Sequence, residues 1–288
     1  MLTYFKNHFK YGKVNWRILL IKGTLLFFGL FIMALGISLY LPTGIGLSDV
    51  DFTVYTFIYL WRGEIMPNTD VGPYYSTVLM FFFIAVSLLT LFFGLISASI
   101  QYKKWKNKQA WNSVIILLIT DIIVIFTFPQ IVNFFLLPWG EGGVVGVLYI
   151  LSDWFESLSG QPNTTLTVQN AGIRGWMFIF AFLVFCLGVS LWAKSTWTPG
   201  PYNSVCLAFM KMTKLNYQIS RILCNVIIIT PGAIAIWFLN SGDRTAAQAF
   251  FDNFGIATIA FVFISGPIIN FIMKYLNKWI NYEKLIRY

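Results

Sequence analysis

The sequence predicts an all-α membrane protein with six transmembrane helices, arranged as two inverted-topology repeats of three helices that each carry a short broken or re-entrant helix. Three observations lead to this fold class. The 288-residue chain is 58% hydrophobic and 11% charged, whereas a soluble domain carries about 25% charged residues. Six apolar runs are long enough to cross a bilayer. The motif that ends one run, LGISLY at 35–40, returns at the end of another as LGVSLW at 187–192.

The distribution of charge predicts the orientation of the spans. The net charge is +9, and the basic residues gather in alternate connections, from the N-terminal segment and the loop 103–108 to the C-terminal tail. The other connections hold most of the acidic residues. This alternation is the positive-inside pattern. It predicts a multi-pass protein of the plasma membrane with both termini in the cytoplasm, and it accounts for the basic charge without a nucleic-acid partner.

The first repeat is expected to occupy residues 1–137. Its first span ends at the motif, and the glycines that follow interrupt the helix before it resumes as a short helix at 47–61. Turn-forming residues at 62–73 predict an outer loop, and Pro129 is expected to kink the third span. The three spans are predicted at about 17–41, 74–99 and 111–137.

Residues 138–171 are expected to form an outer segment without a membrane span. The apolar run within GEGGVVGVLYILSDWFESLSG, at 140–160, is too short to cross a bilayer. It therefore predicts a short interfacial or re-entrant helix. The polar stretch that follows contains Asn163-Thr164-Thr165, which matches the N-glycosylation pattern, a motif that is common by chance.

The second repeat is expected at 172–288. A proline- and glycine-rich break after the second motif precedes a short helix at 203–213, and Pro231-Gly232 predicts a hinge or kink in the fifth span. The basic tail is amphipathic and is expected to lie along the inner headgroups. The three spans are predicted at about 172–193, 217–239 and 255–273. Because three spans separate the two motifs, one repeat begins inside and the other outside, which makes them inverted repeats.

Asp121, in IILLITDIIVIF, is the acidic residue that lies deepest in a predicted span. A carboxylate there costs several kcal/mol unless it is paired, solvated or protonated. Two interpretations stay open. Asp121 is a proton- or cation-coupling residue or a ligand contact, or it is a neutral carboxyl in a structural hydrogen bond.

The starts of the two short helices supply the other candidate residues. Free backbone N–H groups at a helix start favour an anion or a capping oxygen. Ser48 and Asp49 lie at the first start, and Tyr202, Asn203 and Ser204 lie at the second. These residues cap their helices, bind a ligand between the two repeats, or do both.

Arginine, tryptophan and glycine residues at the spans predict mainly structural roles. Arg174 and Arg221 are most simply interfacial anchors, and Arg221 is also a candidate for guarding an inner opening. Tryptophans at span ends, Trp192 among them, predict interfacial belts rather than a binding cage. Gly36 and Gly188 predict close packing of helices.

The sequence lacks the residues that several classes of functional site require. The separated Cys186, Cys206 and Cys224 and the single histidine, His8, have no metal-binding or disulfide spacing. Nucleotide-binding loops, nucleophile elbows and paired-carboxylate motifs are also absent from the sequence. We therefore expect no metal, no cofactor, no catalytic residue and no enzyme activity.

Three stretches carry the pattern of a known family. They read Gly44-Ile45-Gly46-Leu47-Ser48-Asp49, Thr198-Pro199-Gly200-Pro201-Tyr202-Asn203, and Gly255-Ile256-Ala257-Thr258 followed by Gly266-Pro267. Together with Arg221 they resemble the YczE-like (YitT-related) family of uncharacterised bacterial integral membrane proteins. The sequence departs from the family where Leu47 replaces a proline, Asn203 an acid and Ala257 a glycine. The resemblance covers about 20–60 and 175–273, and it implies the fold and topology but little about activity.

Two functions fit these features best. In the leading hypothesis the chain is a small-molecule or ion transporter whose repeats alternate access around a midplane site, with Asp121 as the coupling or ligand residue. The alternative is a non-transporting membrane partner, such as an assembly, immunity or sensory component, that docks another protein through 138–172. A membrane enzyme acting on lipids is a third hypothesis. A polar central cavity lined by both repeats would favour the transporter, and an apolar centre would favour the partner protein.

Overall fold

The computed structural model describes residues 16–105, 109–162, 167–197, 200–238, 250–251 and 253–282. The predicted basic segment around His8, the glycosylation motif, part of the second break and most of the acidic loop around Asp243 lie outside these residues. The described elements are helical, and six helical stretches are long and apolar enough to cross a membrane. The all-α class and the number of spans are thereby confirmed. These stretches are Trp16–Thr43, Asn68–Lys103, Leu118–Leu136, Val168–Ser195, Ile219–Phe238 and Ile256–Trp279.

The described part of the first half of the chain contains four helices and one short 3-10 turn. Their bounds are α2 Trp16–Tyr40, η1 Leu41–Thr43, α3 Asp49–Arg62, α4 Asn68–Trp105 and α5 Gln109–Leu136. The outer loop predicted at 62–73 is shorter than expected, because α4 begins at Asn68. Asp70 lies in the first turn of α4, where the helix dipole favours an acidic residue. Pro129 lies within α5, which continues past it.

The second half begins with the outer segment. A hairpin with isolated bridges at Pro138–Val145 and Trp139–Gly143 leads into α6. The helix bounds are α6 Val147–Ser159, α7 Val168–Ser195, α8 Gly200–Thr213 and α9 Tyr217–Ala235, which continues as η2 Ile236–Phe238. The last span consists of α11 Ile256–Ile259, the π-helical turn η3 Ala260–Ile264 and α12 Ser265–Trp279. The sequence pattern did not predict this π-helical turn, which is often a feature of functional sites.

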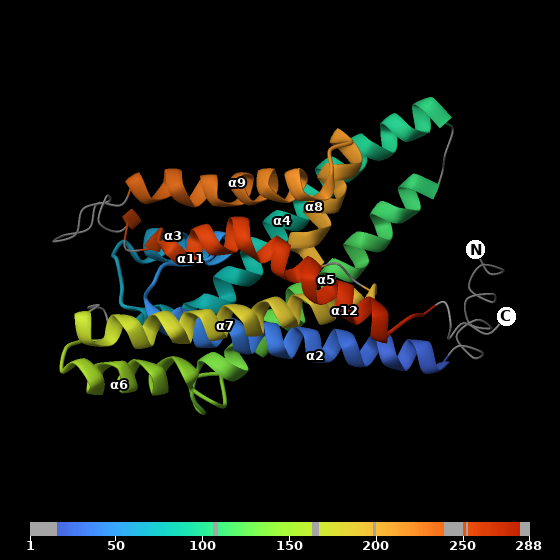
Figure 1. The fold of residues 1–288 in the computed structure, drawn as a ribbon. Helices are drawn as coiled ribbons and strands as arrows, with labels where there is room; N and C mark the ends of the chain where they lie inside the picture. Colours follow the sequence, from blue (N-terminus) through green and yellow to red (C-terminus); the bar gives the residue numbers. More distant parts are fainter. Residues whose placement is uncertain are drawn as a thin grey trace.

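Helices α2 and α7 form the central spine of the molecule and lie side by side along most of their length (Figure 1). A Cβ atom added at Gly36 would lie 2.7 Å from the backbone nitrogen of Phe185, and one added at Gly188 would lie 2.3 Å from that of Met33. The residue numbers of these contacts rise on one helix as they fall on the other, so the two helices are antiparallel. Glycine is required at both positions because the opposing atoms belong to the backbone.

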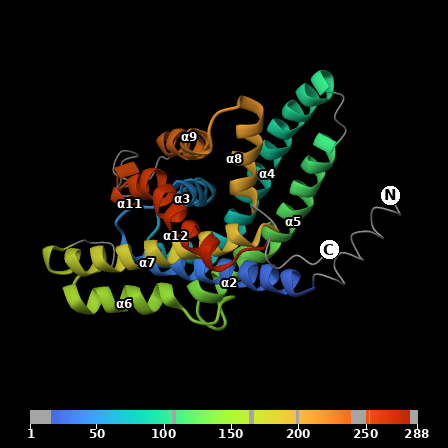
Figure 2. The ribbon, with the colours of Figure 1, turned by 45° about the vertical axis from the view of Figure 1, so that its right-hand side comes forward.

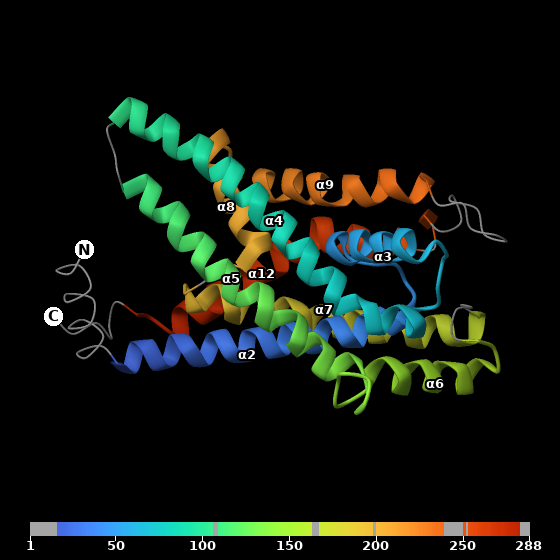
Figure 3. The same cartoon turned by 180° about the vertical axis from the view of Figure 1, so that it is seen from behind.

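The other helices pack in matching pairs, against the spine or against one another. α5 lies against α2, and α12 lies against α7. Short helix α3 packs against α9, and short helix α8 packs against α4. Two further views show α4 and α5 leaning away from the α2–α7 spine, with α8 beside α4 (Figures 2 and 3). This arrangement brings the beginnings of α3 and α8 to the middle of the protein.

Candidate functional site

A cavity of about 60 Å³ lies where the beginnings of α3 and α8 meet. Helices from both halves of the chain line it. The polar side chains of its wall include Ser48, Asp49, Asp51, Tyr202, Asn203 and Arg221. Since one water needs about 10–15 Å³ of such space, the cavity has room for about four water-sized groups. We call it the central cavity.

Ser48 caps the start of α3. Its Oγ accepts a hydrogen bond from the Asp51 backbone N–H at 3.1 Å and donates one to Asp51 Oδ2 at 2.5 Å. The Ser48 N–H in turn donates to the Tyr40 hydroxyl at 3.3 Å. The capping interpretation of Ser48 is therefore correct, and the cap turns the side chain of Asp51 towards the cavity wall.

Asp49 connects the two halves through Tyr202 on α8. The Tyr202 hydroxyl lies 2.8 Å from Asp49 Oδ2 and 2.5 Å from Asn225 Oδ1 on α9. A tyrosine hydroxyl has one proton and can donate to only one of them. The other contact then needs its own donor, which is either a protonated Asp49 or the Asn225 amide turned so that its nitrogen donates. This chain of groups can hold and move a proton.

Arg221 on α9 brings a positive charge to the same wall. Its Nη1 donates to Asn203 Oδ1 at 3.3 Å, and its guanidinium lies over the Tyr202 ring at 5.3 Å from the centroid. It also acts electrostatically on the Asp49 carboxyl. The predicted role as an interfacial anchor is wrong for Arg221, since only 7% of it is exposed and its contacts lie inside the protein.

Asp51 has a different set of partners. Its two carboxyl oxygens receive hydrogen bonds from the Ser48 and Tyr75 hydroxyls. Among the described residues no basic side chain contacts it. Asp51 is 2% exposed, so its carboxyl group is buried with hydroxyl donors alone.

Asn203 and Ser204 do not cap α8, contrary to expectation. The helix begins at Gly200, three residues earlier than predicted, with Pro201 in its first turn, where a proline is readily accommodated. Both side chains instead reach across to neighbouring helices. Ser204 Oγ donates to Asp121 Oδ1 on α5 at 2.7 Å. Asp121 is fully buried in this α5–α8 contact and does not line the central cavity.

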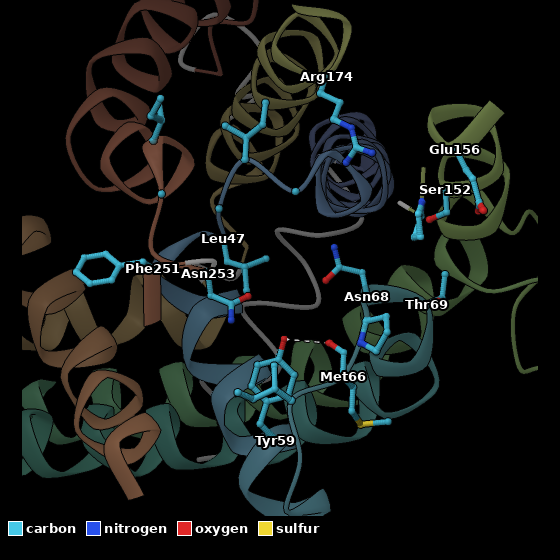
Figure 4. Close-up of a pocket in the computed structure, with 18 of the residues that line it drawn as sticks. Leu47, Tyr59, Met66, Asn68, Thr69, Ser152, Glu156, Arg174, Phe251 and Asn253 are labelled. Carbon is cyan, nitrogen blue, oxygen red and sulfur yellow. Dashed lines mark hydrogen bonds between the residues drawn. The ribbon is translucent and has the colours of Figure 1, made fainter. Parts of the chain in front are cut away.

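A larger pocket of about 730 Å³ opens on the side that the charge pattern predicts to be outside. Figure 4 shows Asn68 and Thr69 at the start of α4 facing Ser152 and Glu156 of α6, with Asn253 and Phe251 on the opposite side. We call it the outer pocket. Arg174 reaches its wall, where its Nη1 donates to the Thr43 carbonyl at 3.3 Å.

Arg174 is 1% exposed, so the predicted interfacial anchoring is wrong for this residue as well. Its guanidinium lies 4.6 Å from the centroid of the Phe155 ring of α6. Together with the hydrogen bond to Thr43, this contact joins α6 and α7 to the end of η1. Hydropathy places such an arginine at a span end but cannot tell whether it faces headgroups or protein.

The non-helical stretch 44–48 separates the two spaces. Gly44 to Leu47 line the outer pocket, and Ser48 onward lines the central cavity. Leu47 N–H donates to the Asn253 carbonyl at 2.8 Å, and Thr258 Oγ1 donates to the Leu47 carbonyl at 2.5 Å. Gly46, at a φ of 106°, lies against Gly255, where an added Cβ would be 2.6 Å from the backbone nitrogen. This stretch and the start of α11 therefore form the wall between the pocket and the cavity.

Several cavity residues escaped prediction. Tyr75 and Trp192 resemble interfacial aromatic residues in the sequence, yet both line the cavity, and Trp192 is 4% exposed. Phe261, within the π-helical turn, and Ser265, directly after it, also line the cavity. For Asp51 a signal was available, because it lies one half-turn after Asp49 in the same first turn.

Comparison with known families shows to which family the chain belongs. A family of unknown function, DUF6198, matches residues 20–274. No curated protein and no solved structure matches the chain. Among the described residues no group of three potential metal ligands comes together. What the arrangement offers is a small cavity with carboxyl, phenol and guanidinium groups, separated from a larger pocket by residues 44–48 and the start of α11.

Proposed function

From the premise that the chain belongs to the DUF6198 family, whose function is unknown, we propose that it is a small-molecule or ion transporter with a midplane site between inverted repeats. The observation that carries this proposal is the 2.8 Å contact between Asp49 of α3 and Tyr202 of α8 in one cavity that both halves line, where these polar groups lie among mostly apolar side chains. Discontinuous helices that meet at such a site are typical of transporters built from inverted repeats. The chemistry we propose is binding and gating rather than bond breaking.

The packing of the spine supports the inverted repeats. Gly36 and Gly188 are the glycines of the two sequence motifs, and Met33 and Phe185 each lie three residues before them. The contact of Gly36 with Phe185 becomes the contact of Gly188 with Met33 when each residue is replaced by its counterpart. A two-fold axis through the spine produces this exchange. The same replacement turns the contact of α3 with α9 into the contact of α8 with α4.

The wall between the two spaces supports alternating access. It is made of one extended strand of chain and held by hydrogen bonds such as Leu47 to Asn253. Breaking few contacts would connect the outer pocket with the central cavity. We propose that this opening and a matching one on the inner side alternate, with Asp121 and its partner Ser204 coupling the movement of α5 and α8 to a proton. The resemblance of both breaks to the YczE-like family belongs to the same proposal.

Accessibility of the cavity tests the proposal. We would place a single cysteine at Val50, which lines the cavity, in a background where the three buried native cysteines are replaced by alanine. Alternating access predicts modification by a membrane-impermeant thiol reagent from either side of oriented vesicles. The matched control is Val54→Cys, one turn later on α3 and fully buried, which should not react. A Val50→Cys protein that reacts from neither side would contradict the proposal.

The orientation needs its own control. Cysteines at the exposed Lys103 and Glu64 should label from opposite sides of the membrane, with Lys103 inside. Labelling of both cysteines from the same side would contradict the inverted topology. If proton coupling resides at Asp121, Asp121→Asn should flatten the pH dependence of uptake while leaving expression unchanged.

The alternative proposal keeps the outer segment as a docking site for another membrane protein. Its support is the exposure of Trp139, at 83%, together with Ile150 and Trp154 of α6. It predicts that deletion of 144–158 removes a co-purifying protein without changing the reactivity of Val50→Cys. The transporter proposal instead predicts solute uptake into vesicles that contain this chain alone.

A further inference from the structure

The charges around the central cavity do not balance. Asp49 and Asp51 contribute two carboxyl groups, and Arg221 contributes one guanidinium. Arg221 acts on Asp49, and Tyr202 links the two groups. Asp51 receives only hydroxyl hydrogen bonds among the described residues. A buried carboxylate without a positive partner is costly and otherwise takes up a proton, so an occupant that brings a positive charge is what would keep Asp51 charged.

Aromatic rings make up much of the remaining wall. Phe83, Phe128, Phe185, Trp192 and Phe261 all line the cavity. The face of an aromatic ring attracts a cation and is unfavourable for an anion. A carboxyl group beside several rings is therefore a suitable environment for an ammonium group. It is a poor one for a free anion.

A second polar group belongs to Trp192, a residue that lines the cavity. The indole N–H of Trp192 is buried and has no hydrogen-bond acceptor among the described residues. Buried N–H donors in folded proteins are nearly always paired. A ligand atom that accepts a hydrogen bond would satisfy it. An ammonium group held by the carboxyl group and the ring faces would still leave this N–H donor without an acceptor.

We infer that the central cavity binds a small protonated amine that also carries a hydrogen-bond acceptor, as an amino alcohol does. The available space, about four non-hydrogen atoms, limits the ligand to that size in this conformation. Asp51 supplies the negative charge, the aromatic rings surround the ammonium group, and the Trp192 N–H donates to the acceptor. The inference rests on the proposed function for its place in transport, but binding itself does not require transport.

Ligands of equal size and different charge test the inference on the full-length detergent-purified protein. Ethanolamine should raise the melting temperature in a saturable manner, whereas ethylene glycol, its neutral counterpart, and glycolate, its anionic one, should not. Stabilisation by glycolate, or none by ethanolamine, would overturn the inference. This series needs no variant, so it stays decisive even if a substitution impairs folding.

Two substitutions separate the contributions. Asp51→Asn keeps the hydrogen-bond acceptor and removes the charge, and it should weaken ethanolamine binding at least about tenfold, which corresponds to about 1.4 kcal/mol. Asp70→Asn, an exposed change of the same kind on α4, should leave binding unaltered. Trp192→Phe should weaken ethanolamine binding several-fold while leaving methylamine, which lacks the acceptor, unchanged. Equal binding by wild type and Asp51→Asn would exclude the proposed role of Asp51.

Uptake of labelled ethanolamine into proteoliposomes distinguishes this inference from the proposed function. Binding without uptake would support the amine site and argue against transport. Binding and uptake of glycolate instead would support transport and overturn the amine site.

Discussion

The two halves of the chain are alike in the α2–α7 spine and different at the two short helices. In the spine the halves are alike, because Gly36 and Gly188 make equivalent contacts with the backbone of the other helix. At the short helices they differ. α3 begins with a serine cap and two carboxyl groups, whereas α8 begins with a glycine and presents an amide and a hydroxyl to its neighbours. The two halves are thus alike where α2 and α7 pack and different where the proposed ligand would be held.

The largest effect should come from breaking the symmetric part. Gly36→Ala and Gly188→Ala each place a Cβ within 3 Å of opposing backbone atoms, which cannot move aside as a side chain can. We expect each substitution to lower the free energy of unfolding by about 1–3 kcal/mol or more. The two substitutions should lower the melting temperature by amounts similar to each other. Thermal unfolding monitored by size-exclusion chromatography measures this.

The control for that experiment is Gly175→Ala on the same helix α7, where an added Cβ would meet nothing within 4 Å. It should be neutral or slightly stabilising, because alanine favours helix over glycine. A large loss at one motif glycine with none at the other would contradict the equivalence of the halves.

The next effect concerns the asymmetric charges. Arg221→Gln removes the cation that acts on Asp49, and we expect a loss of about 1–3 kcal/mol in stability. Asp49→Asn in the same protein should recover part of that loss. A double-mutant cycle of melting temperatures measures the coupling, expected at about 0.5–3 kcal/mol. Strictly additive effects would show that the two groups do not interact across the halves.

The serine that opens α3 should matter less. Ser48→Ala removes a helix cap, and we expect a loss of about 1 kcal/mol. Ser48→Gly should cost only a few tenths of a kcal/mol for the cap itself, because glycine is tolerated at that position. Equal losses in both variants would assign the effect to the lost bond with Asp51 instead of the cap.

The smallest effect belongs to the outer segment, which has no counterpart in the first half. Tyr149 on α6 donates to Glu141 Oε2 at 2.8 Å, at an exposed site. Burial, and secondly the Glu141 carboxylate, raise the pKa of Tyr149 to about 12. Tyr149→Phe should change stability by less than about 0.5 kcal/mol.

The raised pKa also predicts a pH dependence. Since the folded pKa lies above the ordinary value of 10.0, the stabilisation is fully present below that value and is lost only as the pH rises through about 12. The difference between wild type and Tyr149→Phe should therefore stay constant from about pH 6 to about pH 9. A difference that changed within this range would contradict the assigned bond.

Much of the architecture follows from the sequence alone. The length and hydropathy of six runs determine six membrane-spanning helices, and glycine at 44 and 46 and at 200 determines where two helices break. The charge of Asp49 and the capping chemistry of Ser48 place polar groups at the first break. These are local properties, which neighbouring residues in the chain set by themselves.

Only the tertiary structure decided which side chains face one another. Tyr75, Trp192 and Asn225 come from three different helices, and hydropathy cannot separate an aromatic residue in a cavity from one at the membrane interface. The same limit explains why Asp121, the strongest candidate in the sequence, pairs with Ser204 beside the cavity instead of lining it. The sequence shows that a polar residue lies in or near a membrane span, but its burial and its partner depend on how the helices cross.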